Sequence, residues 1–128
     1  MHNGGDDVHN YDDLLNGVAE AGYFVVAARA GYDDYCFEEY EDQLRNIEWA
    51  LTDKKYSQYV YVDNPAGLLG HSMGGAATHT CAADKDAVNR YRLGAAVALH
   101  PVYNKADAVI PIFFGSGSKD FAVPAATV

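Results

Sequence analysis

The sequence is poor in cysteine and in basic residues, and it contains no long apolar run. Its two cysteines, Cys36 and Cys81, lie far apart and form no C-x-x-C pair, so nothing demands a disulfide and the compartment stays open. Nine Lys and Arg residues against 18 Asp and Glu give a formal net charge of −9. This balance argues against nucleic acid and anionic membranes as partners, because both are bound through basic patches. The lack of an apolar run of spanning length argues against a membrane span.

What is present indicates one folded domain of the α/β class. A length of 128 residues allows one domain at most, and an apolar share of 49% is enough for a core. Helices are expected at residues 11–21, at residues 37–51 and directly after Ser72, and strands at residues 23–27, 66–70, 95–99 and 110–114. The connection 84–92 is polar. Strands that alternate with helices predict a mostly parallel sheet flanked by helices, with functional groups at the carboxyl ends of the strands.

The strongest chemical signal lies at residues 66–75, AGLLGHSMGG. Within it, GHSMG fits the G-x-S-x-G nucleophile elbow, in which a serine projects from a sharp turn between a strand and a helix. Side chains at Gly70 and Gly74 would collide with the crossing backbone, which explains the two glycines. Ser72 would also lie at a helix N-terminus, where free N–H groups favour developing negative charge. The alternative is a tight turn whose serine only caps the helix.

Together with its surroundings, this pattern resembles the α/β-hydrolase superfamily, and in particular its small lidless serine esterases. These are the dienelactone hydrolase, cutinase-like polyester hydrolase and chlorophyllase groups. The matching segments are GYFVVA at residues 22–27, NPAGLLGHSMGG at 64–75, LHP at 99–101 and IPIFFGSGSKDFAVP at 110–124. The resemblance covers nearly the whole chain and implies a partial α/β-hydrolase fold that contains strands four to seven of the family.

The resemblance also implies a catalytic site. Ser72 matches the nucleophile and Asp120 the acid of a catalytic triad. The backbone N–H of Met73 matches one oxyanion donor, and Asn3, in the loop after strand three of the family, is the expected second donor. The substrate cleft is expected to include four residues: His71, His100, Val102 and Tyr103.

Two departures from the family pattern matter. The polyester hydrolases carry a tryptophan where this chain has Val102, which weakens any expectation of an aromatic polyester substrate. More importantly, no histidine follows Asp120, where the resemblance implies the general base. His100 is the only replacement within the chain at the correct edge of the sheet. His79 lies about 10 Å along the helix from Ser72, and His71 points to the other side of the turn.

The family sheet also contains a third strand between the segments that correspond to residues 23–27 and 66–70, and no such strand is expected here. Either those two segments approach each other abnormally or an open slot remains between them. The resemblance therefore implies a single incomplete α/β-hydrolase domain over residues 1–128, a fragment of a longer hydrolase shortened at both ends.

The resulting expectation is a serine hydrolase that acts on small carboxylic esters through an acyl-enzyme, with the catalytic histidine missing from this chain. An alternative is a catalytically incompetent pseudo-hydrolase that binds a small ligand or a partner at the same cleft. A third possibility is a phosphate-binding module that uses the helix start at Gly74 and Gly75, but the sequence lacks the accompanying lysine. No metal or cofactor is expected, since the His and Cys spacings fit no metal site.

Overall fold

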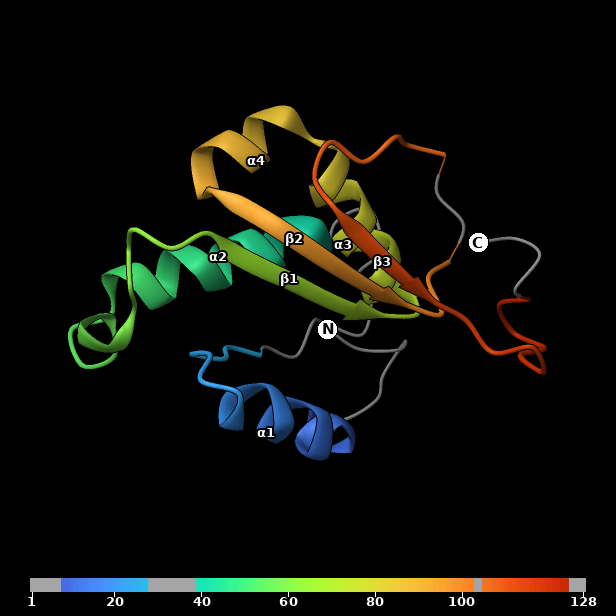
Figure 1. Ribbon diagram of the computed structural model, residues 1–128, viewed down its shortest axis with the longest axis horizontal. Coiled ribbons are helices and arrows are strands. Elements are labelled where there is room, and N and C mark those ends of the chain that lie inside the picture. The colour runs from blue at the N-terminus through green and yellow to red at the C-terminus, as the bar shows by residue number, and fades with distance from the viewer. Residues whose placement is uncertain (1–7, 28–38, 103–104, 125–128) are drawn as a thin grey trace.

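Three parallel strands form the centre of the molecule. The computed structural model describes residues 8–27, 39–102 and 105–124, and Figure 1 shows how they are arranged. Strands β1 (Ala66–His71), β2 (Leu93–Leu99) and β3 (Ile112–Gly115) pair in this order, and both pairings are parallel. The sequence-based prediction of a mostly parallel sheet flanked by helices is therefore confirmed as a general α/β arrangement.

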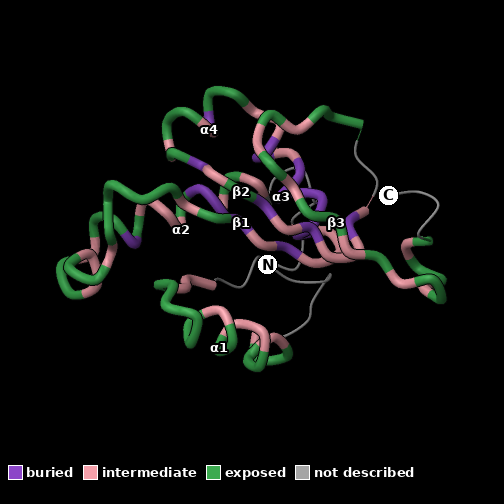
Figure 2. The backbone as a smooth tube through the Cα atoms, in the orientation of Figure 1, coloured by how far each residue is buried: buried purple, intermediate pink, exposed green. Residues whose placement is uncertain are grey.

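Helices cover the sheet chiefly through one central helix. The described α-helices are α1 (Asp12–Glu20), α2 (Glu39–Thr52), α3 (Met73–Ala83) and α4 (Lys85–Tyr91), and two short 3-10 turns lie at Val8–Tyr11 and Ser57–Tyr59. Helix α3 packs across both β1 and β2, and helices α2 and α4 pack against α3 (Figure 1). Because α3 lies between the sheet and another helix, it is buried on several sides, and its small residues permit this close approach (Figure 2).

The hydrophobic core lies where these elements meet. Leu44 of α2 joins residues from β1, α3, α4 and β2 in one cluster, whose other members are Leu68, Cys81, Ala82, Ala87, Leu93 and Ala96. Tyr40 and Ile47 pack against this cluster, so α2 turns an apolar face toward the core. Leu51, one turn after Ile47, is exposed. The core is therefore small, and alanine provides much of it.

Helix α1 lies apart from the sheet (Figure 1). Leu14, Leu15 and Val18 are half-buried, while the rest of the helix is exposed. The N-cap position is held by Tyr11, with no side-chain capping bond. Asp12 and Asp13 still place negative charge in the first turn, where the helix dipole favours it.

The prediction of a strand at Tyr23–Ala27 is wrong. These five residues follow α1 without forming a described strand. A cavity of about 390 Å³ separates four of them, together with Gly22, from β1, and we call this cavity the edge slot. Of the two alternatives considered above, the described residues therefore show the open slot. A continuous apolar run indicates burial, but it does not provide the neighbouring strand that pairing requires.

Other boundaries also differ from the predictions. The polar connection at residues 84–92 contains helix α4, which begins after Asp84; its carboxylate accepts bonds from the backbone N–H groups of Asp86 and Ala87. Strand β2 begins two residues earlier than expected, at Leu93. Strand β3 begins two residues later, at Ile112, because Pro111 lacks the N–H needed for the ladder.

Candidate functional site around Ser72

Ser72 occupies a strained turn between β1 and α3. Its φ of 55° and ψ of −119° are unusual for a residue with a side chain. Its side chain makes no capping bond to α3, in contrast with the alternative of an ordinary helix cap. The backbone of Ser72 is fixed on both sides, because its N–H donates to Leu99 O at 2.9 Å and its carbonyl accepts from Val102 N at 3.2 Å. The turn is thus tied to the carboxyl end of β2.

The glycines on either side of Ser72 explain how the turn closes. A Cβ atom at Gly70 would overlap the carbonyl group of Gly74 and the hydroxyl of Thr78, as the sequence predicted for this position. A Cβ atom at Gly75 would lie 3.0 Å from Pro101 Cα and 3.2 Å from the carbonyl oxygen of Leu99. The start of α3 therefore approaches β1 on one side and the end of β2 on the other.

A buried polar brace, formed by Gln43 and Thr78, supports the turn from behind. The Gln43 amide donates to Gly74 O at 3.0 Å. The Thr78 hydroxyl lies at hydrogen-bond distance from two acceptors, Gly74 O at 2.9 Å and Gln43 Oε1 at 3.0 Å. Both side chains are buried. Sequence reasoning missed this brace. The available signal was a glutamine at residue 43, next to Leu44 on the side of α2 that faces the core.

His71, His100 and Asp120 lie together beside this turn. The rings of His71 and His100 meet edge to face, with centroids 5.6 Å apart. His100 Nε2 lies 4.0 Å from Asp120 Oδ2, and the Asp120 side chain is 20% exposed. His71 Nδ1 is also 2.8 Å from the hydroxyl of Tyr11, a contact that the sequence did not indicate. The end of β1 and the segments after β2 and β3 thus bring His71, His100 and Asp120 together at one edge of the sheet, where the Tyr11 hydroxyl joins them.

The carboxylate of Asp120 is held in its ionised form. Its Oδ1 accepts hydrogen bonds from the backbone N–H groups of Ala122 and Val123, each at 2.9 Å. The bond from Val123 is the largest cause of a lowered pKa for Asp120, and the Ala122 bond and the nearby His100 and His71 act in the same direction. Asp120 Oδ1 thus accepts hydrogen bonds from its own loop, while Oδ2 faces the imidazole of His100.

The remaining predicted site residues are placed as follows. The N–H of Met73 is in the first turn of α3, where helix N–H groups have no partner within the helix. Val102 is half-buried, and its N–H binds Ser72 O. Asn3 and Tyr103 lie outside the described residues. His79 is buried with its ring edge to face against Phe114 at 5.1 Å, which gives it a packing role.

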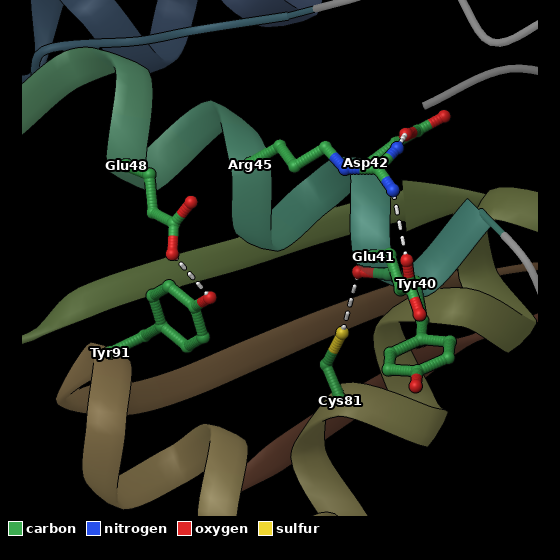
Figure 3. A network of polar contacts seen from close by, with 7 residues as sticks. All are labelled: Tyr40, Glu41, Asp42, Arg45, Glu48, Cys81 and Tyr91. Atoms are coloured by element: carbon green, nitrogen blue, oxygen red, sulfur yellow. Dashed lines mark hydrogen bonds and ion pairs between the residues drawn. The ribbon is translucent and has the colours of Figure 1, made fainter.

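Away from this edge, the polar contacts of α2 are structural. Figure 3 shows Arg45 paired with Glu41 and Asp42, and Glu48 accepting a hydrogen bond from Tyr91 of α4. Cys81 donates to Tyr40 O, and burial is the largest cause that raises the pKa of this thiol to about 12. Cys81 is therefore a packing residue and not a reactive thiol.

The described part of the chain contains no cluster of three or more His, Cys, Asp or Glu side chains that could hold a metal ion. Within the same residues, no helix combines the length and apolar character that crossing a membrane requires.

Comparisons of the chain with protein-family models, curated proteins and solved structures find no match.

Proposed function

We propose that this chain carries the nucleophile and the acid of a serine hydrolase that acts on carboxylic esters through an acyl-enzyme. The observation that supports this most directly is the conformation of Ser72, which is strained and is not used to cap α3. Strained backbone of this kind persists where the surrounding structure enforces it, and it is concentrated at functional sites. The proposal includes the α/β-hydrolase fold suggested by the resemblance, of which the described sheet would be a part.

The proposed chemistry follows from the groups at this edge. Ser72 Oγ attacks the acyl carbon, its proton passes to an imidazole, and the alcohol leaves after receiving that proton. The N–H of Met73 stabilises the oxyanion of the tetrahedral intermediate, a contribution of about 3 kcal/mol for a single donor in other serine hydrolases. Asp120, held ionised by its own loop, orients the imidazole and stabilises its charged form.

The general base is proposed to be a histidine that this sequence does not contain, since the resemblance implies one after Asp120. Oδ2 is the carboxylate oxygen left to receive it, because Oδ1 already accepts two backbone bonds. His100 is the alternative base, since it lies at 4.0 Å from Oδ2 and precedes Val102, which binds Ser72.

A second candidate function is ligand binding without turnover at the same edge. It is favoured by the hydrogen bond between His71 and Tyr11, which engages the histidine next to Ser72 with a group other than the nucleophile. In this case a small ester or acid would bind at Ser72 and dissociate unchanged.

The test is the hydrolysis of short-chain p-nitrophenyl esters by the 128-residue chain and by a version extended along its own coding sequence. Each is compared with its Ser72→Ala variant. We expect turnover only in the extended form and its loss on substitution. Turnover by the short chain that is abolished by His100→Gln would instead assign the base to His100. Ester binding without turnover in both forms would favour the second candidate.

A further inference from the structure

The N–H group proposed to stabilise the oxyanion belongs to the peptide unit that joins Ser72 to Met73. The ψ angle of Ser72, −119°, sets the orientation of this unit. Its carbonyl oxygen accepts two hydrogen bonds, from Ala76 N at 3.1 Å and from Val102 N at 3.2 Å. Because the N–H and C=O groups of a trans peptide point in opposite directions, bonds that fix the carbonyl also fix the direction of the Met73 N–H. The placement of this donor therefore depends on the first turn of α3.

The local sequence holds this turn weakly, because it contains Gly74 and Gly75. Glycine has more backbone freedom than any other residue and forms helix less readily than alanine does. Close packing requires the second of these glycines, since a Cβ atom there would lie 3.0 Å from Pro101 Cα. The helix propensity of the turn is therefore low, and contacts from outside α3 are needed to hold it.

The brace of Gln43 and Thr78 provides such a contact at Gly74. In an α-helix a carbonyl oxygen accepts from the N–H four residues later, so the helix itself can satisfy Gly74 O. This oxygen nevertheless also lies 3.0 Å from the Gln43 amide and 2.9 Å from the Thr78 hydroxyl. An aliphatic side chain would fill either buried position without needing a polar partner, so packing alone does not explain the two polar side chains. Since Gln43 comes from α2, its bond ties the turn to a second helix.

We propose that Gln43 is a positioning residue for the reaction at Ser72, a role that rests on the function proposed above. Through Gly74 O it holds the first turn of α3, and it thereby keeps the Met73 N–H directed at the place where negative charge develops. Neither the elbow motif nor the resemblance assigns a role to this glutamine. Because the charge develops in the transition state, loss of the bond lowers the maximal rate and leaves ligand binding little changed.

The substitutions that test this role are made in the 128-residue chain. Gln43→Met keeps an unbranched side chain of similar length and removes the amide. Thr78→Val removes the hydroxyl at nearly constant shape, whereas Thr78→Ser retains the hydroxyl. Thr80→Val is the matched control, because the Thr80 hydroxyl also donates to a carbonyl four residues earlier in α3, Ala76 O at 3.0 Å, and is not part of the brace.

The measurement is the rate at which a fluorophosphonate modifies Ser72 in the presence of free imidazole, followed by mass spectrometry over a range of probe concentrations. The phosphonyl oxygen takes the place of the oxyanion. We expect Gln43→Met and Thr78→Val to lower the maximal rate about tenfold and to change the half-saturating concentration by less than about twofold. Thr78→Ser should recover most of the rate, and Thr80→Val should change it by less than about twofold.

An unchanged maximal rate in Gln43→Met, or equal losses in Thr78→Val and Thr80→Val, would overturn the inference. If Gln43→Met does not fold, the comparison of Thr78→Val with Thr78→Ser decides the outcome. A Ser72 that does not react in the unmodified chain would instead contradict the proposed function.

The positioning role is then decided by NMR, because the backbone ¹³C and amide chemical shifts of Ser72 and Met73 report the conformation of the turn without any reaction. We expect these shifts to change in Gln43→Met and Thr78→Val and to stay as they are in Thr80→Val. Shifts that change no more in Gln43→Met than in Thr80→Val would overturn the inference, whether or not Ser72 reacts.

Discussion

Replacing Ser72 with glycine should stabilise the protein, and this separates a strained nucleophile turn from a simple helix cap. A non-glycine residue with a φ of 55° and a ψ of −119° carries strain of about 1–3 kcal/mol. Glycine removes this strain, but its greater freedom in the unfolded chain offsets about 0.5–1 kcal/mol. The expected net gain for Ser72→Gly is therefore about 0–2.5 kcal/mol in the free energy of unfolding, with a central value of about 1 kcal/mol.

Ser72→Ala is the matched variant, because it removes the hydroxyl and retains the strain. Since the hydroxyl makes no capping bond to α3, this variant should change the unfolding free energy by less than about 0.5 kcal/mol. Urea denaturation followed by far-UV circular dichroism and by fluorescence of the single tryptophan, Trp49, gives both values.

An ordinary cap gives the opposite order. Loss of a capping serine to alanine costs about 1 kcal/mol, and loss to glycine costs a few tenths. That pattern would refute the reasoning. Arg92 is a useful control, because its φ of 52° is also positive, but its guanidinium donates to Val62 O and Asp63 O. Arg92→Gly loses these bonds and should gain less than Ser72→Gly.

Three further predictions concern the supports of the site. Gly70→Ala should destabilise the fold by about 3 kcal/mol in urea titrations, because its Cβ overlaps the start of α3. The control Gly17→Ala has open space around it and should stabilise the fold by about 0.5–1 kcal/mol. Equal effects of the two substitutions would contradict the close approach of β1 and α3 at Gly70. Asp84→Ala should cost about 1 kcal/mol of unfolding free energy and should reduce helicity, since it removes the N-cap of α4. An unchanged unfolding free energy would contradict the capping role of Asp84. Because the folded-state pKa of Asp120 is lowered, its contribution to stability is fully present above its usual value of 3.8 and is lost as the pH falls through the folded-state pKa; Asp120→Asn should flatten the acid limb of the stability profile, and an unchanged limb would contradict this.

The fold was predictable from the sequence where local pattern and tertiary contact agree. The apolar strand before Ser72 and the small-residue helix after it match β1 and α3, because α3 packs directly against β1 and buries Leu68 and Gly70. The segment at residues 23–27 shows the limit of such reasoning. Its composition is that of a buried strand, yet a strand also needs a neighbour to pair with, and sequence pattern says nothing about that neighbour.

The candidate site was predictable in its residues more than in its contacts. The spacing of Ser72 and Asp120 after apolar runs predicted that both would follow parallel strands at one edge, as they do. The hydrogen bond between Tyr11 and His71 joins residues 60 apart, and the brace from Gln43 reaches Thr78 across two helices. Such contacts depend on how α2 and the segment before α1 pack, and single-residue preferences do not encode this.

The proposed role of Ser72 is tested most directly by reaction with a fluorophosphonate, with and without added free imidazole, and mass spectrometry of the modified peptides. We expect one adduct, on Ser72, that forms faster with imidazole, because free imidazole supplies the base that the proposal pairs with Asp120. Asp120→Asn should reduce this acceleration, and Ser72→Ala should abolish the adduct. Modification at other residues, or an adduct on Ser72 whose rate changes with neither imidazole nor Asp120, would contradict the account.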